Sequence, residues 1–430
     1  MSTTHPIPLD RPSGIPLSRL SDAALWLAVF LGGFVIVEPA PYEAFLGLLI
    51  PLWLLGGLRI PRAIGPLILL MVTFMVGGLI ASTQMKYSYP TYYPITGFLA
   101  LSACFFACVV ADHPRRLPAI VNAWLAAAIV TTALGVVGYA GLTPEGLFTR
   151  YGRADGGFQD PNVFGPFLVF PYAVFLQRAL TRSFRSLLLN GLGALFVLLG
   201  VFLSFSRGAW GLAVFATLMV IVMLYATERR SLVRARYVAL AIGGLVLAGL
   251  LFAVILSIPA IAKLFAERAH VVQNYDAQHF GRFDRHVIGF NMMLSRPLGI
   301  GALQFGHLFG EDEHDIWLKT LTTYGWFGFF SYLILVIWTL IASFPLLFRS
   351  GPNQKTAQVA YFVFFGHIVL ATVIDIDHWR HVYLLFGILW GLIAIERRRR
   401  NGLAREAAFA GVHPREKFRE IAVSPQVGLR

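Results

Sequence analysis

The sequence predicts an all-α, polytopic membrane protein with about twelve transmembrane helices and one large polar loop between the ninth and tenth spans. Of the 430 residues, 57% are hydrophobic and 13% are charged, whereas about 25% of the residues of a soluble domain carry charge. Apolar runs of about 17 to 25 residues, the length that crosses a bilayer as a helix, recur along the chain. The longest interruption between these runs covers residues 259–321.

The expected spans are the apolar runs between charged, proline-containing or glycine-containing segments. They cover residues 22–39, 42–58, 64–82, 94–111, 118–139, 161–180, 186–204, 209–226, 237–258, 322–346, 357–374 and 381–395. The chain then divides into an N-terminal segment (1–21), transmembrane helices one to nine (22–258), a polar loop expected to carry the site (259–321), helices ten to twelve (322–396) and a basic tail (397–430).

Loop charge predicts the orientation, because Lys and Arg of short loops are retained in the cytoplasm. Alternate connections and both terminal segments hold most of the 35 Lys and Arg, so both termini are expected in the cytoplasm. The same retention explains the formal net charge of +13, and no nucleic-acid partner is expected. The cations on the opposite side are site candidates: Lys86, Arg150, Arg153, Arg207, Lys263, Arg268, Arg282, Arg285, Arg296, Lys319 and Arg380.

Two cysteines, Cys104 and Cys108, lie four residues apart inside an apolar run. That spacing places both on one face of a helix, where they are expected to pack as small polarizable side chains instead of forming a disulfide bridge.

Arg207 stands in SFSRGAW, where two spans meet with almost no loop between them. One interpretation is that its side chain reaches the lipid headgroups. The other is that it points into a polar cavity and binds a phosphate. Arginine suits that task, because its planar guanidinium donates two parallel hydrogen bonds and stays protonated.

Arg282 and Arg285 in GRFDRH are three residues apart, which places them on one face of a helix. An ordinary surface ion pair with Asp284 is one interpretation, above all for Arg285. The other is that convergent arginines neutralise a diphosphate, which becomes a good leaving group once its developing charge is stabilised.

His314 lies in EDEHDIWLKTL, ahead of an amphipathic helix that leads into the tenth span. With an ordinary pKa of about 6.5, histidine can accept a proton from a hydroxyl group at neutral pH. The neighbouring acids could orient its ring. Two other interpretations are a solvated acidic loop and a metal site formed by these acids with His307, although the spacing is not specific for a metal.

Three further segments outside the expected membrane carry weaker signals. The glycines of PLGIGALQFG, residues 297–306, indicate a tight turn that places the flanking helices. Asp160 before Pro161 indicates a helix start. For Arg150 and Arg153 two interpretations stay open, binding of phosphate and contact with lipid headgroups. The cluster DIDHWRH, which contains Arg380, could line the same cavity or mark the membrane interface.

Three of these elements resemble the O-antigen ligase and polymerase superfamily of bacterial cell-surface polysaccharide assembly. They are SRGAW after a mid-chain span, an arginine about fifteen residues before PLGIG (Arg282 to Pro297), and a histidine that opens an HxxWL-like segment (His314 to Phe330). The resemblance covers residues 150–395. It departs at Asp315, where many members have Asn, and at His286, where many have an aromatic residue.

The resemblance implies a metal-independent, inverting glycosyltransferase of the bacterial inner membrane, with no cofactor and with its active site in the periplasmic loop. Its partners would be an undecaprenyl-diphosphate-linked glycan donor, a lipid A-core or glycan acceptor, and membrane lipids. Mapped by motif, Arg207 and Arg282 would bind the diphosphate and His314 would act as general base. Arg285 is added from its spacing to Arg282.

Ligation of O-antigen to lipid A-core is the function that we expect. An O-antigen or exopolysaccharide polymerase, which joins lipid-linked repeat units, uses the same donor and the same bond type. From another class, a transporter or flippase of an anionic lipid would use the arginines without turnover. Such transporters often show paired half-repeats with broken helices, and we find no such pairing in the sequence.

Overall fold

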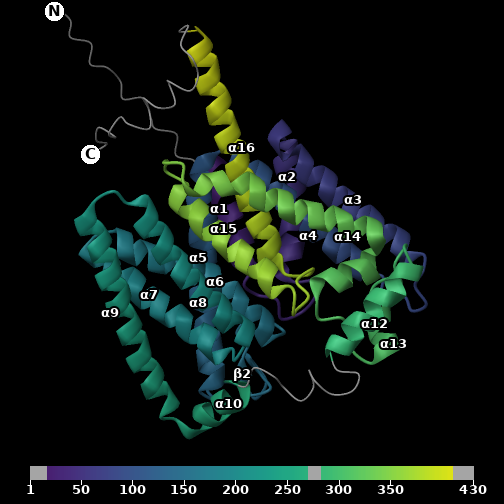
Figure 1. Ribbon diagram of the computed structural model, residues 1–430, viewed down its shortest axis with the longest axis horizontal. Helices are drawn as coiled ribbons and strands as arrows, with labels where there is room; N and C mark the ends of the chain where they lie inside the picture. The colour runs from purple at the N-terminus through teal and green to yellow at the C-terminus, as the bar shows by residue number, and fades with distance from the viewer. Residues whose placement is uncertain (1–16, 270–281, 410–430) are drawn as a thin grey trace, which may run out of the picture.

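The computed structural model describes residues 17–269 and 282–409, and it is almost entirely helical (Figure 1). The first nine helices are α1 (Leu17–Leu31), α2 (Pro41–Leu55), α3 (Gly65–Ser82), α4 (Tyr92–Asp112), α5 (Leu117–Tyr139), α6 (Pro161–Thr181), α7 (Phe184–Leu203), α8 (Arg207–Thr227) and α9 (Ser231–Leu256). The others are α10 (Pro259–Ala269), α12 (Arg282–Ser295), α13 (Gln304–Phe309), α14 (Ile316–Ser343), α15 (Gln354–Leu370) and α16 (Arg380–Phe409). The strands β1 (Thr149–Arg150) and β2 (Arg153–Ala154) form a short antiparallel hairpin.

Eight helical segments in the described part of the chain are long and apolar enough to cross a membrane. They comprise α3 to α9 and α14, three of them extended by a turn of 3₁₀ helix. The other expected spans fall on α1, α2, α15 and α16, of which the first three have 15, 15 and 17 residues. The multi-span helical class is therefore confirmed, while the count of twelve stays a prediction.

Two boundaries differ from those that hydropathy indicates. The helix that contains the twelfth expected span continues through the four arginines after Glu396 and ends at Phe409, because Arg, Ala and Glu are good helix formers with or without a membrane. Likewise α1 begins at Leu17, inside the segment expected to precede the first span. The outer parts of both termini, residues 1–16 and 410–430, lie outside the described residues.

Small residues let the central helices approach one another closely. A Cβ atom on Gly77 of α3 would lie 2.6 Å from the carbonyl oxygen of Tyr324 in α14, and one on Gly387 of α16 would lie 2.7 Å from Phe106 in α4. Close backbone contact at small residues is the usual way in which helices associate where lipid removes the hydrophobic drive. These contacts fix α14 against α3 and α16 against α4.

The prolines inside α6 leave backbone acceptors that neighbouring helices use. Pro171 has no N–H group, so the carbonyl of Phe167, four residues earlier, lacks its helical donor. The indole Nε1–H of Trp124 in α5 donates to this carbonyl at 3.2 Å. The proline thus ties α6 to α5 without leaving a buried polar group unpaired.

Within the polar interruption, α12 and α13 form a small helical insert against α14, whereas α10 packs against α9. A separate apolar cluster holds α12, α13 and α14 together: Met293, Ile300, Phe305, Leu318 and Leu321. In Figure 1, α12 and α13 lie on the right and α10 lies below β2 on the other side.

The glycine turn of residues 297–301 fits a break in α14. Gly325 has φ +65° and interrupts the helix, so nearby backbone groups lose their helical partners. The turn replaces them: Ile300 N–H donates to Thr322 O at 2.7 Å, and Trp326 N–H donates to Pro297 O at 3.0 Å. Gly299 and Gly301 also have positive φ, which confirms the predicted tight turn.

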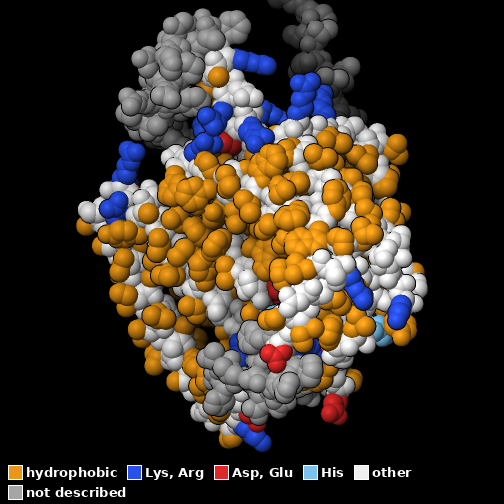
Figure 2. All heavy atoms as spheres, turned by 45° about the vertical axis from the view of Figure 1, so that its right-hand side comes forward, with side chains coloured by type: hydrophobic (Ala, Val, Ile, Leu, Met, Phe, Trp, Pro, Cys, Tyr) orange, Lys and Arg blue, Asp and Glu red, His pale blue; other side chains and the backbone are white. Residues whose placement is uncertain are grey.

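Charge divides the molecule into two ends. On the face drawn in Figure 2, hydrophobic side chains cover the middle, and Lys and Arg gather toward the top. The connections after α2, α4, α6, α8 and α14 carry the arginine-rich loops, and we call this end the basic end. The described connections at the opposite end cover residues 32–40, 83–91, 140–160, 204–206, 257–269, 282–315 and 371–379, and we call this end the site end.

Candidate functional site

Arg207 is the first residue of α8, and the local sequence explains its placement. α7 ends at Leu203, Phe205 takes a positive φ of 45°, and the Ser206 hydroxyl caps the new helix by accepting a hydrogen bond from Ala209 N–H at 3.4 Å. This sharp turn brings α8 back without an intervening loop. Arg207 is half-buried, so part of its side chain is covered by the protein.

A second arginine secures the same turn from the hairpin between α5 and α6. Arg153 of β2 is 5% exposed. Its Nε donates to the carbonyl of Ser204 at 2.7 Å, and its Nη2 donates to Asn162 Oδ1 at 2.7 Å. Asp160 caps α6 by accepting from Asn162 N–H at 2.7 Å, as predicted. Arg153 therefore fastens the start of α6 to the element that carries Arg207.

The other two predicted diphosphate ligands lie in α12. Arg282 is its first residue, and the position of the Arg282 side chain lies outside the described part of the chain. Arg285 forms a hydrogen-bonded ion pair with Glu311, between Nη2 and Oε2. Arg285 thus pairs with Glu311 of the loop before α14, a residue 26 positions away that the sequence did not indicate as its partner.

His314 occupies a sharp bend immediately before α14, with φ +49°. Its Nδ1 lies 3.7 Å from Asp375 Oδ1, and its Nε2 lies 3.8 Å from Glu311 Oε1. The side chain is 35% exposed, so it can meet a molecule from outside. Of the four acids around it in the sequence, only Glu311 is within ion-pair distance of the ring.

The remaining acids have other partners. Asp315 caps α14 by accepting from Trp317 and Leu318 N–H groups, and burial raises the pKa of its carboxyl. Glu313 is turned inward, accepts a hydrogen bond from the Thr322 hydroxyl, and is 3% exposed. Burial raises the pKa of Glu313 to about 7. The carbonyl of Glu313 lies 2.8 Å from His286 Nε2, so this histidine joins α12 to the loop before α14.

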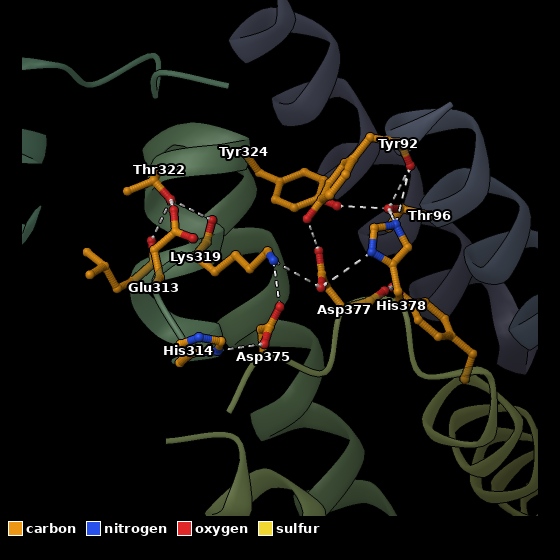
Figure 3. A network of polar contacts seen from close by, with 12 residues as sticks. Tyr92, Thr96, Glu313, His314, Lys319, Thr322, Tyr324, Asp375, Asp377 and His378 are labelled. Carbon is orange, nitrogen blue, oxygen red and sulfur yellow. Dashed lines mark hydrogen bonds and ion pairs between the residues drawn. The ribbon is translucent and has the colours of Figure 1, made fainter. Parts of the chain in front are cut away.

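Behind His314 lies a buried ionic network (Figure 3). Lys319 of α14 points its Nζ at Asp375 Oδ2, 2.6 Å away, and at Asp377 Oδ1, 4.0 Å away. The Tyr92 hydroxyl of α4 donates to Asp377 Oδ2 at 2.5 Å. Burial alone would raise the pKa of Asp375, but the Lys319 ammonium and the His314 ring outweigh it, so this pKa lies well below its usual value. Asp375 is therefore an ionised carboxylate held beside His314 by Lys319.

The sequence missed most of this network. The sequence indicates Lys319 only as one of the cations on the site side. For the DIDHWRH cluster it leaves two interpretations open, lining of a cavity or a position at the membrane interface. The structure joins Asp375 and Asp377 of that cluster to Lys319. Arg380, from the same cluster, pairs instead with Glu43 at 2.5 Å and Glu38 at 3.2 Å, and ties α16 to the start of α2. The signal in the sequence for these contacts is the large number of charged residues in DIDHWRH, next to the apolar run 357–374.

Arg207 and His314 belong to the same end of the bundle, and α15 connects their surroundings. A Cβ atom on Gly208 would lie 2.5 Å from Leu370 Cδ1, so the start of α8 packs against the end of α15. One residue further along, the Ala371 carbonyl accepts a hydrogen bond from Ile316 N–H at 2.9 Å. The first turn of α8 and the first turn of α14 are therefore fixed to one short segment.

Two smaller expectations can also be compared with the structure. Cys104 and Cys108 are free thiols that line an apolar groove of about 460 Å³ with residues of α2 and α3, so the prediction of packing without a bridge is confirmed. Across residues 17–269 and 282–409, no three His, Cys, Asp or Glu side chains are grouped so as to hold a metal ion. His307 contacts Tyr87 and Tyr89.

A comparison with protein families finds one match to this chain, described as O-antigen ligase, over residues 192–333. The matched segment begins in α7 and ends in α14, and so contains Arg207, Arg285, His314 and Lys319. It confirms the resemblance to the O-antigen ligase superfamily. A comparison with curated proteins gives no match.

Proposed function

Because residues 192–333 carry the O-antigen ligase domain, we propose that this protein transfers O-antigen polysaccharide from undecaprenyl diphosphate to a sugar hydroxyl of lipid A-core. The observation that carries the proposal is His314, half-exposed between two carboxylates at the end of the bundle that also bears Arg207. A base that a substrate can reach, near arginines at one end of a membrane bundle, fits an anionic donor whose lipid stays in the bilayer.

The donor diphosphate would bind the arginines of α8 and α12. Arg207 is the strongest candidate for binding the diphosphate. It is half-buried and is the first residue of α8, and the N-terminal end of a helix dipole also favours an anion. Arg282 stands at the start of α12. Arg285 donates through Nη2 to Glu311, and a guanidinium has five N–H donors, so this bond is compatible with a further bond to phosphate.

His314 would act as the general base. Asp375 beside Nδ1 favours the tautomer that keeps a proton on that nitrogen, which leaves Nε2 to accept the proton of the acceptor hydroxyl. The acceptor oxygen forms a bond to the anomeric carbon while the bond from this carbon to the diphosphate oxygen breaks. The electron pair leaves on the lipid diphosphate, whose charge the guanidinium groups stabilise. This single displacement inverts the anomeric configuration without requiring a metal.

The proposed orientation follows from charge. Lys and Arg loops favour the cytoplasm, and the arginine-rich connections form the basic end. The site end would then face the periplasm, in the bacterial inner membrane, with both termini in the cytoplasm.

The decisive experiment is reconstitution of the full chain in lipid nanodiscs with an undecaprenyl-diphosphate glycan, in buffer with a metal chelator. Two acceptors are offered separately: lipid A-core and a second lipid-linked repeat unit. Extension of lipid A-core is the expected result. Extension of only the repeat unit would identify a polymerase, and extension of neither would favour transport.

His314→Ala should abolish transfer in this assay, because no other group would take the proton from the acceptor. Donor binding and the melting temperature should stay near those of the wild type, since the imidazole is partly exposed. The matched control is His113→Ala, an exposed histidine at the basic end, which should leave the rate unchanged. Normal turnover by His314→Ala would remove the general base from the mechanism.

A further inference from the structure

The connection between α3 and α4 carries an aromatic surface that the proposed chemistry does not use. Its sequence, KYSYPTYYP over residues 86–94, contains four tyrosines. Tyr92 and Tyr93 point into the bundle, where their hydroxyls bond to Asp377 and to the backbone of Thr323. Tyr87 is 53% exposed, so a large aromatic ring faces outward at the site end.

This exposed ring belongs to an ordered group. The rings of Tyr87 and His307 stack, with centroids 4.1 Å apart and planes at 27°. The Tyr89 ring lies 5.9 Å from the same imidazole at 30°, and its hydroxyl is hydrogen-bonded to His307 Nε2. We call Tyr87, Tyr89 and His307 the aromatic platform.

The backbone beneath the platform is fixed by one buried side chain. Gln304 of α13 is 6% exposed. Its Oε1 accepts from the N–H groups of Lys86 and Tyr87 at 3.0 and 3.1 Å, and its Nε2 donates to the Tyr87 carbonyl at 2.9 Å. The connection and α13 therefore form one unit. A binding surface whose rings are already positioned loses less conformational entropy when a ligand binds.

The platform lies beside the loop that carries His314. A Cβ atom on Gly306, next to His307, would lie 2.6 Å from Asp312 Oδ1, and Asp312 is two residues from His314. The platform belongs to α13 and to the connection before α4, whereas Arg207 belongs to α8. The start of α8 is joined to the His314 region through the end of α15, whereas α13 lies at the right of the view in Figure 1 and α8 lies left of its centre.

We propose that the aromatic platform binds a pyranose ring of the acceptor glycan and presents its hydroxyl to His314. The C–H groups of one pyranose face form a flat, weakly positive apolar patch, and an aromatic face carries the complementary negative quadrupole. The carboxylate of Asp312, close to Gly306 of the platform's helix, can accept hydrogen bonds from sugar hydroxyls. The donor diphosphate would bind the arginines of α8 and α12, which leaves the platform on α13 and the connection before α4 to the acceptor. This inference rests on the proposed function.

Tyrosine at a membrane boundary also anchors proteins to lipid headgroups. Two observations favour a sugar. The Asp312 carboxylate, close to Gly306, would repel a lipid phosphate, and the rings of Tyr87 and Tyr89 contact His307 instead of standing singly as interfacial anchors do. Lipid anchoring is therefore an outcome that the experiment must separate from sugar binding.

The test measures acceptor KM and kcat of the full chain in nanodiscs with saturating donor. Tyr87→Ala should raise acceptor KM by about three- to tenfold, the effect of losing one aromatic stacking contact, with kcat and donor KM unchanged. Tyr87→Trp and Tyr87→Phe should retain wild-type KM, because they keep the stacking face. The matched control is Tyr225→Ala, an equally exposed tyrosine near the basic end, which should have no effect.

A second measurement does not require turnover: titration of the chain with the soluble oligosaccharide released from lipid A-core. Wild type should bind it several-fold more tightly than Tyr87→Ala. An unchanged acceptor KM and unchanged oligosaccharide binding in Tyr87→Ala would overturn the platform even when transfer is normal. A lower melting temperature in lipid without a change in binding would assign the ring to headgroup anchoring, and so overturn it too. Absence of transfer by the wild type would count against the proposed function, while oligosaccharide binding would still decide the platform.

Discussion

Lys319 is a charged side chain, 3% exposed, inside an otherwise apolar helix. Burial of an ammonium group costs several kcal/mol unless opposite charges compensate it. Here Asp375 and Asp377 compensate it from the connection between α15 and α16, and the same carboxylate of Asp375 stands beside His314. One ion pair, Lys319–Asp375, therefore contributes to stability and also places a carboxylate beside the proposed base.

Lys319→Met should lower the free energy of unfolding by roughly 3–5 kcal/mol, because the buried Asp377 and the partly buried Asp375 would lose their cation. Melting temperature in detergent measures this change. The double variant Lys319→Met/Asp375→Asn should recover part of the melting temperature but not the transfer activity, since the carboxylate that orients His314 is gone. Full activity of the double variant would show that this carboxylate does not position the ring.

Arg207→Lys should reduce transfer by at least tenfold, because a point charge on a flexible stem cannot reproduce two parallel hydrogen bonds to a phosphate. The matched control is Arg296→Lys, an exposed arginine at the site end, which should keep wild-type activity. Steady-state rates with the lipid-diphosphate donor check both. Equal rates for Arg207→Lys and wild type would assign Arg207 to contact with headgroups.

At the scale of elements, the break in α14 shows what a turn motif does in a membrane bundle. Gly325 opens the helix, and the glycine turn of residues 297–301 occupies the gap and supplies the missing hydrogen bonds. Tyr93 of α4 braces the same place, since its hydroxyl donates to Thr323 O and accepts from Ala302 N–H. The insert is thereby attached to the bundle below His314.

Gly325→Ala should destabilise the protein by roughly 1 kcal/mol or more, because alanine disfavours φ +65° and its Cβ would lie 2.8 Å from the Leu298 carbonyl. Activity should fall with it, as the insert shifts. Gly244→Ala in α9 is the matched control, with nothing within 4 Å of the added methyl group. Helix propensity should make this control neutral or slightly stabilising. Equal melting temperatures for the two variants would contradict this account of the break.

The helices were predictable from hydropathy, because membrane spans need long apolar runs. The glycine turn and the Asp160 cap were predictable because each depends on local backbone preferences. Contacts between distant segments were not. Nothing local indicates that Arg285 pairs with Glu311 or that Lys319 selects Asp375, since these pairs depend on how α12, α14 and α15 pack. His314 and Arg207 were singled out by motif, and their catalytic roles stay predictions.

At the scale of the whole molecule, the two ends differ in charge and in connectivity. The basic end gathers the arginine loops, while the connections of the site end bond to one another, as in Val35 N–H to Gly157 O and Arg153 to Ser204 O. A membrane protein with this asymmetry is expected to keep its cations in the cytoplasm.

This orientation predicts opposite labelling of two exposed serines. In a chain with Cys104 and Cys108 replaced by alanine, Ser88→Cys at the site end should react with a membrane-impermeant maleimide in intact spheroplasts. Ser183→Cys, between α6 and α7, should react only after lysis. Both serines are exposed, so accessibility within the fold is matched. The reverse pattern would place the candidate site in the cytoplasm.

The helix α9 stands beside the bundle. None of the residues in its most apolar stretch of 18 is buried, whereas 67% of those in the corresponding stretch of α4 are buried. Its fixed points are near its ends, at Tyr237 and where Phe252 meets the aromatic rings of Phe202 and Phe265. Natural variation should therefore accumulate unevenly. Along the middle of α9, selection can preserve only hydrophobicity and helix propensity, so the sequence of this stretch can differ between related chains. In α4, by contrast, the side chains must keep shapes that fit their neighbours.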